Sequence, residues 1–329
     1  MKTVGLTYDL KTEYEFRADD PPDANAEFDH PDTVGCIAKA IESHGFKTKK
    51  IGNVSNLLEG LDKLGVDIVF NISEGISGRN RESQVPLLLE MAGVPFVGSD
   101  ALSLGLTLDK IIAKKVFIAD KIPTPRFFEV KDSSSLNGTD HMKFPFIVKP
   151  RFEGSSKGLS DSSRVENMEE LKKQIDYITG TYKQPALVEE FIRGEEFTVA
   201  FIGNNPPEVL PIVQIKIDGK CNLKDKFYTF GHITSNRLEY VCPARINHDL
   251  RQKITDVAIK TYEAVECLDF GRVDIRVDEE GHPYVLEINP LPSLSQEDVF
   301  MVTAKVMGKT YDEMIFKILE SALKRYNLI

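Results

Sequence analysis

The sequence lacks the features that mark zinc-binding, membrane-spanning and nucleic-acid-binding proteins. Its four cysteines are scattered and form no CxxC pair, which predicts buried free thiols in a reducing compartment rather than a zinc site. No apolar run approaches the roughly 20 residues of a membrane span, and the first residues, MKTVGLTYDL, lack the apolar segment of a secretory signal. Lys and Arg total 41 against 51 Asp and Glu, so the net charge of −10 disfavours a large basic groove for nucleic acid. We therefore expect a cytoplasmic protein that binds neither membranes nor nucleic acid.

Two common nucleotide-binding signatures, GxGxxG and GxxxxGK[ST], are also missing. The first hundred residues nevertheless alternate between strand and helix patterns. The expected elements are strands at 2–8, 46–52, 66–72 and 94–99, and helices at 32–45 and 82–93. This alternation predicts an α/β unit in which helices cover a mostly parallel sheet.

The pattern changes after residue 100, where strands and helices no longer alternate regularly. The expected elements are helices at 103–120, 166–180 and 248–266, strands at 144–150, 185–191 and 195–203, a hairpin at 271–290 and a C-terminal helix. A chain of 329 residues that is 41% hydrophobic is long enough for two or three domains with their own cores. We expect divisions near residues 100 and 187, which give the segments 1–99, 100–187 and 188–329.

The expected hairpin, GRVDIRVDEEGHPYVLEINP, places polar and apolar residues on opposite faces. Pairing Asp274 with Glu287 also pairs Arg272 with Asn289 and Val277 with Tyr284, and side chains alternate between the faces of a strand. One face is then apolar, with Val273, Ile275, Val277, Tyr284, Leu286 and Ile288. The other face carries Arg272, Asp274, Glu287 and Asn289.

The polar face of the hairpin has the chemistry of a divalent-metal site. Cross-strand carboxylates repel unless a cation or a proton lies between them. Mg²⁺ binds carboxylate and amide oxygens and fills its remaining positions with phosphate oxygens and water. Asp274, Glu287 and Asn289 therefore predict one or two Mg²⁺ ions against a polyphosphate, and Arg272 would stabilise negative charge beside them. A solvated sheet face is the alternative.

Three stretches offer contacts for the rest of a nucleotide. In FPFIVKPRFEGSSKG, Lys149 ends a strand, and the loop that follows, with Glu153 and the backbone N–H groups of Gly154–Ser156, would close over phosphates. Lys110, in LTLDK, is a further candidate. In LVEEFIRGEEFTV, Glu189, Glu190 and Glu196 would contact adenine and ribose. The alternatives are a mobile surface loop, a solvated helix lysine and a strand edge kept soluble by its charge.

Taken together, these stretches resemble the ATP-grasp superfamily, and within it the D-alanine–D-alanine ligases. The similarity runs from about Val69 to the C-terminus, and its order and spacing are specific. The matching blocks are GVPFVGSDALSLGLTLDK, FPFIVKPRFEGSSKG, LVEEFIRGEEFTVAFIG, EYVCPA and GRVDIRVDEEGHPYVLEINPLP. The resemblance implies an ATP-grasp fold with an N-terminal Rossmann-like domain. It also implies an ATP-dependent ligase that phosphorylates a carboxylate and then joins the acyl phosphate to an amine.

The resemblance also implies roles for individual residues. Lys110 and Lys149 would contact ATP phosphates, and Glu189 and Glu196 would bind adenine and ribose. Ser155 and Ser156 would lie in the loop over the γ-phosphate. Two Mg²⁺ ions, or Mn²⁺, would bind Asp274, Glu287 and Asn289, and the oxyanion hole would consist of Arg272 and the backbone N–H of Ser293.

The sequence departs from this family where the substrates would bind. Glu27 is the nearest candidate for the glutamate that holds the first amino acid's ammonium, and Ser73 and Glu74 replace a His-Gly pair. On the acceptor side, His232 replaces a lysine, Ile233 replaces a tyrosine, and Asp298 replaces a serine that binds the second carboxylate. A carboxylate at Asp298 would repel that group.

We therefore expect small-molecule acid and amine substrates, with an amine other than D-alanine. Alternatively, His232 and Asp298 lie outside the pocket, Lys224, Lys226 or Arg237 substitutes, and the protein is a genuine D-alanine–D-alanine ligase. A non-catalytic nucleotide sensor is an alternative of another class, although such proteins should lose metal ligands first. The family resemblance also suggests a homodimer.

Overall fold

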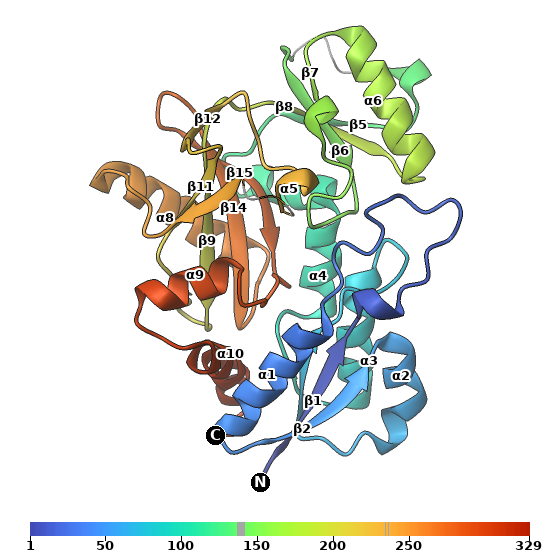
Figure 1. Cartoon of the computed structure of the whole chain (residues 1–329), viewed down its shortest axis with the longest axis vertical. Coiled ribbons are helices and arrows are strands. Elements are labelled where there is room, and N and C mark those ends of the chain that lie inside the picture. Colours follow the sequence, from blue (N-terminus) through green and yellow to red (C-terminus); the bar gives the residue numbers. More distant parts are fainter. Residues whose placement is uncertain (137–141, 234, 236) are drawn as a thin grey trace.

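The computed structural model describes residues 1–136, 142–233, 235 and 237–329, and its strands form three sheets (Figure 1). The elements of the first unit are β1 (Thr3–Tyr8), α1 (Pro31–Ser43), β2 (Lys47–Gly52), α2 (Val54–Gly60), β3 (Ile68–Ile72), α3 (Gln84–Ala92) and β4 (Phe96–Val97). The strand order is β2-β1-β3-β4, and every pair is parallel. The predicted parallel βα unit is confirmed, and β3 is buried along its whole length, as expected of a central parallel strand.

The second sheet is antiparallel and is covered by one amphipathic helix. Its elements are β5 (Phe127–Val130), β6 (Phe146–Pro150), β7 (Arg164–Val165), α6 (Met168–Thr181) and β8 (Ala186–Glu190), in the strand order β5-β8-β6-β7. On α6, Leu171, Ile175 and Ile178 follow helical spacing and pack with Val148 and Val188 of the sheet. Asn167 begins this helix by accepting the N–H groups of residues 169 and 170.

The third sheet contains seven strands and the hairpin. Its elements are β9 (Gly194–Ile202), β10 (Glu208–Val209), β11 (Val213–Ile217), β12 (Asn222–Lys224), α7 (Phe230–Ile233), β13 (Leu238–Val241), α8 (His248–Ala264), β14 (Phe270–Val277) and β15 (Pro283–Asn289). The main order is β13-β11-β9-β14-β15, and β10 and β12 also pair with β9. The hairpin strand β14 therefore lies between β9 and β15. The predicted division near residue 100 falls after β4, and that near residue 187 falls within β8.

The single helix predicted over 103–120 is wrong, because the chain breaks at Asp109 into α4 (Ala101–Leu108) and α5 (Lys110–Ala119). Asp109 leaves the helical conformation, with φ −82° and ψ 89°, and its carboxylate accepts the N–H of Ile112 at 3.3 Å. The same buried carboxylate pairs with Arg79 and Arg151. A polar network thus overrides the continuous helical pattern and places Lys110 in the first turn of α5.

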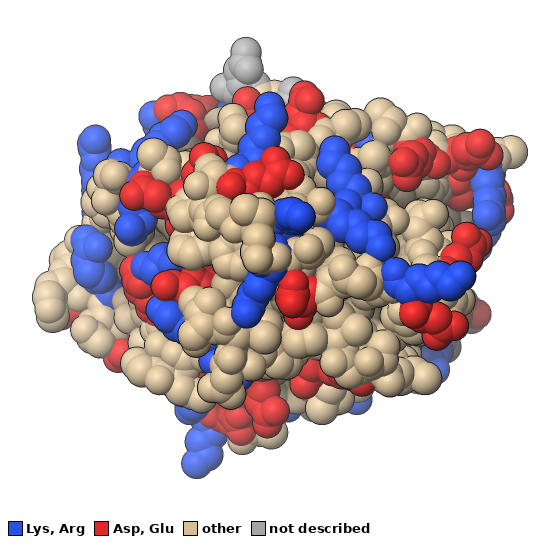
Figure 2. Space-filling view, turned by 90° about the horizontal axis from the view of Figure 1, so that it is seen from below, with Lys and Arg blue, Asp and Glu red and all other residues tan. Residues whose placement is uncertain are grey.

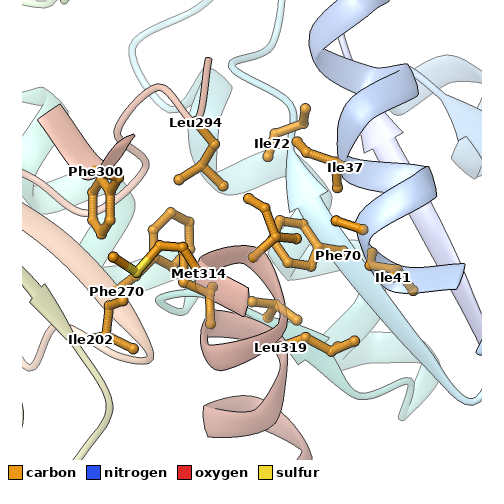
Figure 3. Packing of buried hydrophobic residues seen from close by; sticks show 14 of the residues in the cluster. Ile37, Ile41, Phe70, Ile72, Ile202, Phe270, Leu294, Phe300, Met314 and Leu319 are labelled. Carbon is orange, nitrogen blue, oxygen red and sulfur yellow. The ribbon is translucent and has the colours of Figure 1, made fainter. Parts of the chain in front are cut away.

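The first unit and the third unit, which consists of the seven-stranded sheet and its helices, share one hydrophobic core. The predicted C-terminal helix is two helices, α9 (Val299–Val306) and α10 (Tyr311–Arg325), and α10 packs beside α1 (Figure 1). Figure 3 shows residues of α1, β3, β9, β14, α9 and α10 meeting in this core, among them Ile41, Phe70, Ile202, Phe270, Phe300, Met314 and Leu319. The end of the chain therefore completes the packing of its beginning.

The surface agrees with the composition. On the face in Figure 2, acidic and basic side chains are intermixed rather than gathered by sign. Among the described helices, none is both long and apolar enough to cross a membrane. The four cysteines are free, but only Cys267 is buried, and the other three are half-buried.

Candidate active site

A cavity of about 770 Å³ is lined by residues of the second and third sheets, together with α1 and connecting segments of the first unit. Its size suits a small organic ligand. Most of the predicted site residues line it: Glu27, Glu74, Lys110, Lys149, Glu153, Gly154, Ser155, Ser156, Glu189, Glu190, Glu196, Arg272, Asp274, Glu287, Asn289, Ser293 and Asp298. The fold thus brings together side chains that lie far apart in the sequence.

The hairpin pairs Arg272 with Asn289 and Asp274 with Glu287, as predicted, but its register then shifts. A bulge after Asp274 pairs Ile275 with Val285 and leaves Leu286 without a partner opposite. The predicted apolar face is therefore wrong at Tyr284 and Leu286, because Val285 takes the buried position in the core. Leu286 instead lines the cavity beside Glu287.

Arg272, Asp274 and Asn289 form a hydrogen-bonded group on the cavity side of the hairpin. Arg272 donates from Nε and Nη2 to the two carboxylate oxygens of Asp274, each at 3.0 Å. Asn289 Nδ2 donates to Asp274 Oδ2, also at 3.0 Å. Burial opposes the charge on Arg272, but Asp274 and Asp298 outweigh it and raise the guanidinium pKa. The guanidinium is a permanent positive charge at this point of the cavity.

Glu287 is held by Lys110, the buried lysine that begins α5 after the helix break. Lys110 Nζ lies 2.9 Å from Glu287 Oε2. Burial would raise the pKa of the Glu287 carboxyl, but Lys110 and Lys149 outweigh burial and lower it to about 2. Glu287 is therefore ionised at neutral pH, as a metal ligand must be.

Glu189 is fully buried between two lysines. Its oxygens lie 2.5 Å from Lys114 Nζ and 2.6 Å from Lys149 Nζ. Burial lowers the pKa of Lys114 to about 8, against the opposing effect of Glu189. We did not expect Lys114 from the sequence, although its spacing of four residues from Lys110 places both lysines on one face of α5.

The other two predicted adenine and ribose contacts have partners within the protein. Glu196 Oε2 lies 3.0 Å from Arg276 Nη1, and burial raises the pKa of Glu196 against the effect of Arg276. Glu190 pairs with Arg126 at the rim. Arg276 is a second residue that the sequence reading missed, and its alternation with Arg272 and Asp274 along β14 was the available signal.

The loop after β6 is tied to the first unit by Glu27. Gly154 donates its N–H to Glu27 Oε1 at 2.5 Å, and Lys157 Nζ lies 3.1 Å from Glu27 Oε2. Ser155 and Ser156 adopt positive φ angles of 45° and 56°, a conformation that L-residues seldom adopt. Glu153 pairs with Lys157 and accepts from Gln184 at 2.7 Å. The predicted phosphate loop is thus a tight turn held by ion pairs.

Arg81 completes the set of partners around Glu27. Arg81 Nη2 lies 2.7 Å from Glu27 Oε1, and its Nη1 donates to the carbonyl of Phe152. Burial would raise the pKa of Glu27, but Arg81 and Lys157 outweigh it and lower that pKa. Arg81 was also missed, because it lies in a short 3-10 helix, Arg81–Ser83, with no sequence pattern of its own.

Two more carboxylates, Glu74 and Glu82, stand beside Glu27. One oxygen from each of the three lies within 4.8 Å of the others. Burial, with the charges of Glu82 and Glu27, raises the pKa of Glu74 well above its usual range. Burial also raises the pKa of Glu82 to about 7, against the charge of Arg81. We call Glu27, Glu74 and Glu82 the acidic cluster.

The predicted acceptor residues are separated in the structure. Asp298 lines the main cavity, caps α9 through the N–H of Val299 at 2.6 Å, and lies 3.8 Å from Arg272 Nη1. His232 is buried and lines a different cavity of about 330 Å³. Its Nδ1 accepts the N–H of Thr229 at 3.2 Å, so a neutral ring carries its proton on Nε2. Burial and Arg237 lower the His232 pKa. The predicted role of Ile233 concerns a side chain outside the described residues.

Comparisons with known proteins agree in family and fold. The family described as "D-ala D-ala ligase C-terminus" matches residues 119–320. A D-alanine–D-alanine ligase of Carboxydothermus hydrogenoformans is 34% identical over 304 residues, covering 89% of this chain and 93% of that protein. An uncharacterized protein, y4sG, of Sinorhizobium fredii is 39% identical over 259 residues, covering 79% and 75% of the two chains.

Solved structures show the same fold at lower identity. The D-alanine–D-alanine ligase of Bacillus anthracis, complexed with ATP, superposes with a TM-score of 0.77 at 22% identity, covering 98% of each chain. The VanG D-Ala:D-Ser ligase of Enterococcus faecalis superposes with a TM-score of 0.73 at 21% identity, covering 98% of this chain and 99% of that one. The predicted ATP-grasp fold with its N-terminal α/β domain is confirmed.

Proposed function

Because the chain belongs to the D-alanine–D-alanine ligase family, we propose that this ATP-dependent ligase joins an acid to an amine other than D-alanine through an acyl phosphate. The family consists of C–N bond-forming enzymes that use ATP and Mg²⁺. The observation that supports the proposal is the grouping of Asp274, Glu287 and Asn289 with Lys110 and Arg272 in one cavity. A nucleotide sensor is disfavoured, because every metal-type ligand of the hairpin is retained.

The hairpin residues fit Mg²⁺ by their chemistry. Asp274, Glu287 and Asn289 offer hard oxygen atoms, and Glu287 is ionised because Lys110 and Lys149 lower its pKa. When bound, Mg²⁺ would neutralise phosphate charge and orient the phosphates for transfer. Lys110 and Lys149 would then be free to exchange their carboxylate partners for phosphate oxygens.

The proposed chemistry has two steps. First, an oxygen of the substrate carboxylate attacks the γ-phosphorus of ATP, the bond to the β-phosphate oxygen breaks, and ADP leaves. Second, the amine nitrogen attacks the carbonyl carbon of the acyl phosphate, the C–O bond to phosphate breaks, and the nitrogen loses a proton. Arg272 and the Ser293 N–H would stabilise the oxygen that becomes negative. The loop 153–158 would exclude water that otherwise hydrolyses the acyl phosphate.

Asp298 supports an acceptor other than D-alanine. It lies near Arg272 in the cavity, so a substrate carboxylate placed there would meet a carboxylate as well as a guanidinium. Like charges at close range cost on the order of several kcal/mol. We propose an amine that has no carboxylate at this point or that carries a second positive group. His232 supports this proposal less directly, because it lines the other cavity.

The rival proposal, a genuine D-alanine–D-alanine ligase, needs another cation for that carboxylate. Lys226 and Arg237 both pair with Asp218, at 2.5 and 2.7 Å, and Lys224 is exposed. None of these three residues lines the main cavity as the structure describes it. Their positions therefore favour the proposal over its rival.

A substrate panel tests the proposal. Purified protein with ATP and Mg²⁺ should release ADP with an amine other than D-alanine more efficiently than with D-alanine. Efficient D-alanyl-D-alanine synthesis with no preference for other amines would instead support the rival.

The substitution Asp298→Ser sharpens this test, because serine still caps a helix but carries no charge. We expect the KM for D-alanine as acceptor to fall at least about tenfold in this variant. Asp249→Ser, which removes an exposed carboxylate from the first turn of α8, is the matched control and should leave that KM unchanged. An unchanged KM in Asp298→Ser would mean that Asp298 does not face the acceptor substrate.

A further inference from the structure

The second unit, which consists of the antiparallel sheet β5-β8-β6-β7 and α6, has a hydrophobic core of its own. Its cluster of apolar residues draws every member from residues 128–188, whereas the first and third units share one cluster. The apolar cores therefore join the first unit to the third but not to the second. Polar contacts decide how the loop after β6 sits against the first unit.

The segment between β1 and α1 supplies such contacts at two points, and Figure 1 shows it reaching the second unit. Asp23 Oδ2 accepts the N–H of Gly158 at 2.8 Å, and Glu27 Oε1 accepts the N–H of Gly154 at 2.5 Å. The two carboxylates are four residues apart, and so are the two N–H groups, in the opposite order along the chain. One segment of the first unit thus holds residues 153–158, which we call the phosphate loop, near both ends.

Asp23 also binds the residue that follows α6. It is 5% exposed, and both of its carboxylate oxygens lie 2.9 Å from the hydroxyl of Tyr182, which donates to them. Burial and the charge of Asp23 raise the pKa of Tyr182, so this hydroxyl stays protonated and remains a donor. Hydrogen bonds to an ionised group are roughly twice as strong as those between neutral groups. We call Asp23, Gly158 and Tyr182 the lock.

Gly158 has a backbone conformation and surroundings that only glycine fits. Its φ is +76°, and a Cβ there would lie 2.5 Å from Pro150 Cγ and 3.2 Å from Tyr182 Cε2. The two serines of the loop also have positive φ angles. Such conformations persist only where the surrounding structure holds them. The turn therefore needs an external hold, and Asp23 provides one at Gly158.

Asp23 acts on the main cavity from outside it. It lines the second cavity together with Gly158 and Tyr182, and as the structure describes the main cavity, Asp23 is not part of its wall. Ser155 and Ser156, inside the same loop, do line the main cavity. A displacement of the loop would therefore open the place of phosphate transfer to water, although Asp23 itself contacts no substrate there.

We propose that Asp23 is a positioning residue of the ligase: through Gly158 and Tyr182 it locks the phosphate loop over the cavity and so commits the acyl phosphate to the amine rather than to water. Attack by water returns the acid and releases phosphate, so each such turnover consumes one ATP without forming an amide. The inference rests on the proposed function, since it assigns the control of a side reaction of that chemistry.

The amount of product formed per ADP measures the lock. Hydroxylamine serves as the acceptor, because it reacts with acyl phosphates whatever the natural amine is. With ATP, Mg²⁺ and the most active acid of the substrate panel, the wild type should give about one hydroxamate per ADP. Asp23→Ala loses hydrogen bonds to a charged group and should form hydroxamate about 10–100-fold more slowly. It should also release at least about three ADP for each hydroxamate.

Conservative variants separate positioning from folding. Asp23→Asn keeps an oxygen for the Gly158 N–H, so its ratio of ADP to hydroxamate should stay within about twofold of the wild type. Tyr182→Phe removes one donor from Asp23 and should release about two ADP per hydroxamate. The double variant should lose no more than Asp23→Ala alone, because both changes act through one contact. Asp19→Ala, an exposed change in the same segment, is the matched control and should behave as the wild type.

The ratio distinguishes the lock from a merely structural role. A slower Asp23→Ala that still gives one hydroxamate per ADP would overturn the proposal, as would a fully active one. Circular dichroism verifies the fold of each variant. If Asp23→Ala does not fold, Tyr182→Phe decides, and a wild-type ratio in that variant would overturn the proposal.

Amide hydrogen exchange separates failure of this proposal from failure of the proposed function, because it needs no turnover. In the peptide that covers residues 153–161, Asp23→Ala should exchange at least about tenfold faster than the wild type, and Asp19→Ala should not. If no acid gives hydroxamate, the function fails, but faster exchange in Asp23→Ala and Tyr182→Phe still supports the lock. Unchanged exchange in both variants would overturn it.

Discussion

The cavity contains two groups of charged residues that are arranged in opposite ways. Around the hairpin, Glu287 faces Lys110, and Glu189 faces Lys114 and Lys149, so each of these two carboxylates has a cation within 3 Å. In the acidic cluster, Glu74 and Glu82 have no such partner among the described residues. The first group has three lysines for two carboxylates before any ligand binds, and a metal–phosphate ligand would exchange partners there. In the second group, the negative charge of Glu74 and Glu82 can be neutralised only by a ligand or a proton.

The largest effect is expected when a charge is removed from the first group, which we call the hairpin group: Lys110, Lys114, Lys149, Glu189 and Glu287. Glu287→Gln should lower kcat about 1,000-fold, because a metal ligand is lost and Lys110 keeps no partner. The measurement is amine-dependent ADP release, with circular dichroism to verify the fold. Glu279→Gln, at the exposed turn of the same hairpin, is the control and should behave as the wild type. Wild-type rates in Glu287→Gln would show that the metal site is misplaced.

A second change tests whether the lysines of the hairpin group depend on their shared carboxylate. Glu189→Gln leaves Lys114 and Lys149 buried with no ionised partner between them. We expect a loss of about 3 kcal/mol in the free energy of unfolding, measured by urea denaturation, together with a higher KM for ATP. Added ATP and Mg²⁺ should recover part of the lost stability. A variant as stable as the wild type would mean that the lysines are not held as charges.

In the acidic cluster, removal of a carboxylate charge should raise the free energy of unfolding rather than lower it. The folded-state pKa of Glu82 is raised to about 7, above the ordinary value of 4.5. The folded protein therefore keeps a proton that the unfolded chain has lost, and stability falls as pH rises between those values. The groups that set this pKa are Arg81, Glu27, Lys110 and Glu153, and Glu74 faces Glu82.

Glu82→Gln removes that dependence. The variant should be more stable than the wild type by about 3 kcal/mol at pH 8, and equal to it below about pH 4.5. Urea denaturation across this pH range measures the difference, with Glu90→Gln as the control. A variant less stable than the wild type at pH 8 would mean that Glu82 has a favourable partner.

The smallest effect is expected at Arg237, which does not line the main cavity. Arg237→Ala removes an exposed cation that pairs with Asp218 outside the cavity. The KM for the amine substrate should change less than about twofold, because exposed pairs contribute little. A large rise in that KM would support the rival proposal, in which a surface cation binds the acceptor.

The sequence predicted those parts of the fold that depend on local pattern. Alternation along β14 and β15 was enough to place Asp274 opposite Glu287, and βα alternation was enough for the parallel sheet. It could not predict the bulge at Leu286 or the break at Asp109, because both depend on partners distant in the chain. Asp109 leaves the helix where Arg79 and Arg151 meet it.

The same distinction, between features set by local pattern and features set by distant partners, applies to the site. Apart from the loop residues 153–156, the predicted nucleotide and metal residues lie on regular strands or helices, where spacing indicates which side chains share a face. Lys114 and Arg276 had that signal and were overlooked. Arg81, Glu82 and Lys157 had none, since they come from a short helix and a turn that only the folded chain brings together. The placement of His232 in a second cavity likewise depends on the path of the chain around α7.

The shared core of the first and third units has a consequence for how the protein is made. Ile41 and Phe70 leave the ribosome early, whereas Met314 and Leu319, which cover them, are among the last to emerge (Figure 3). The nascent chain therefore carries an uncovered apolar face of its first sheet through most of translation. Chaperones that bind such surfaces should associate with the growing polypeptide until α10 docks.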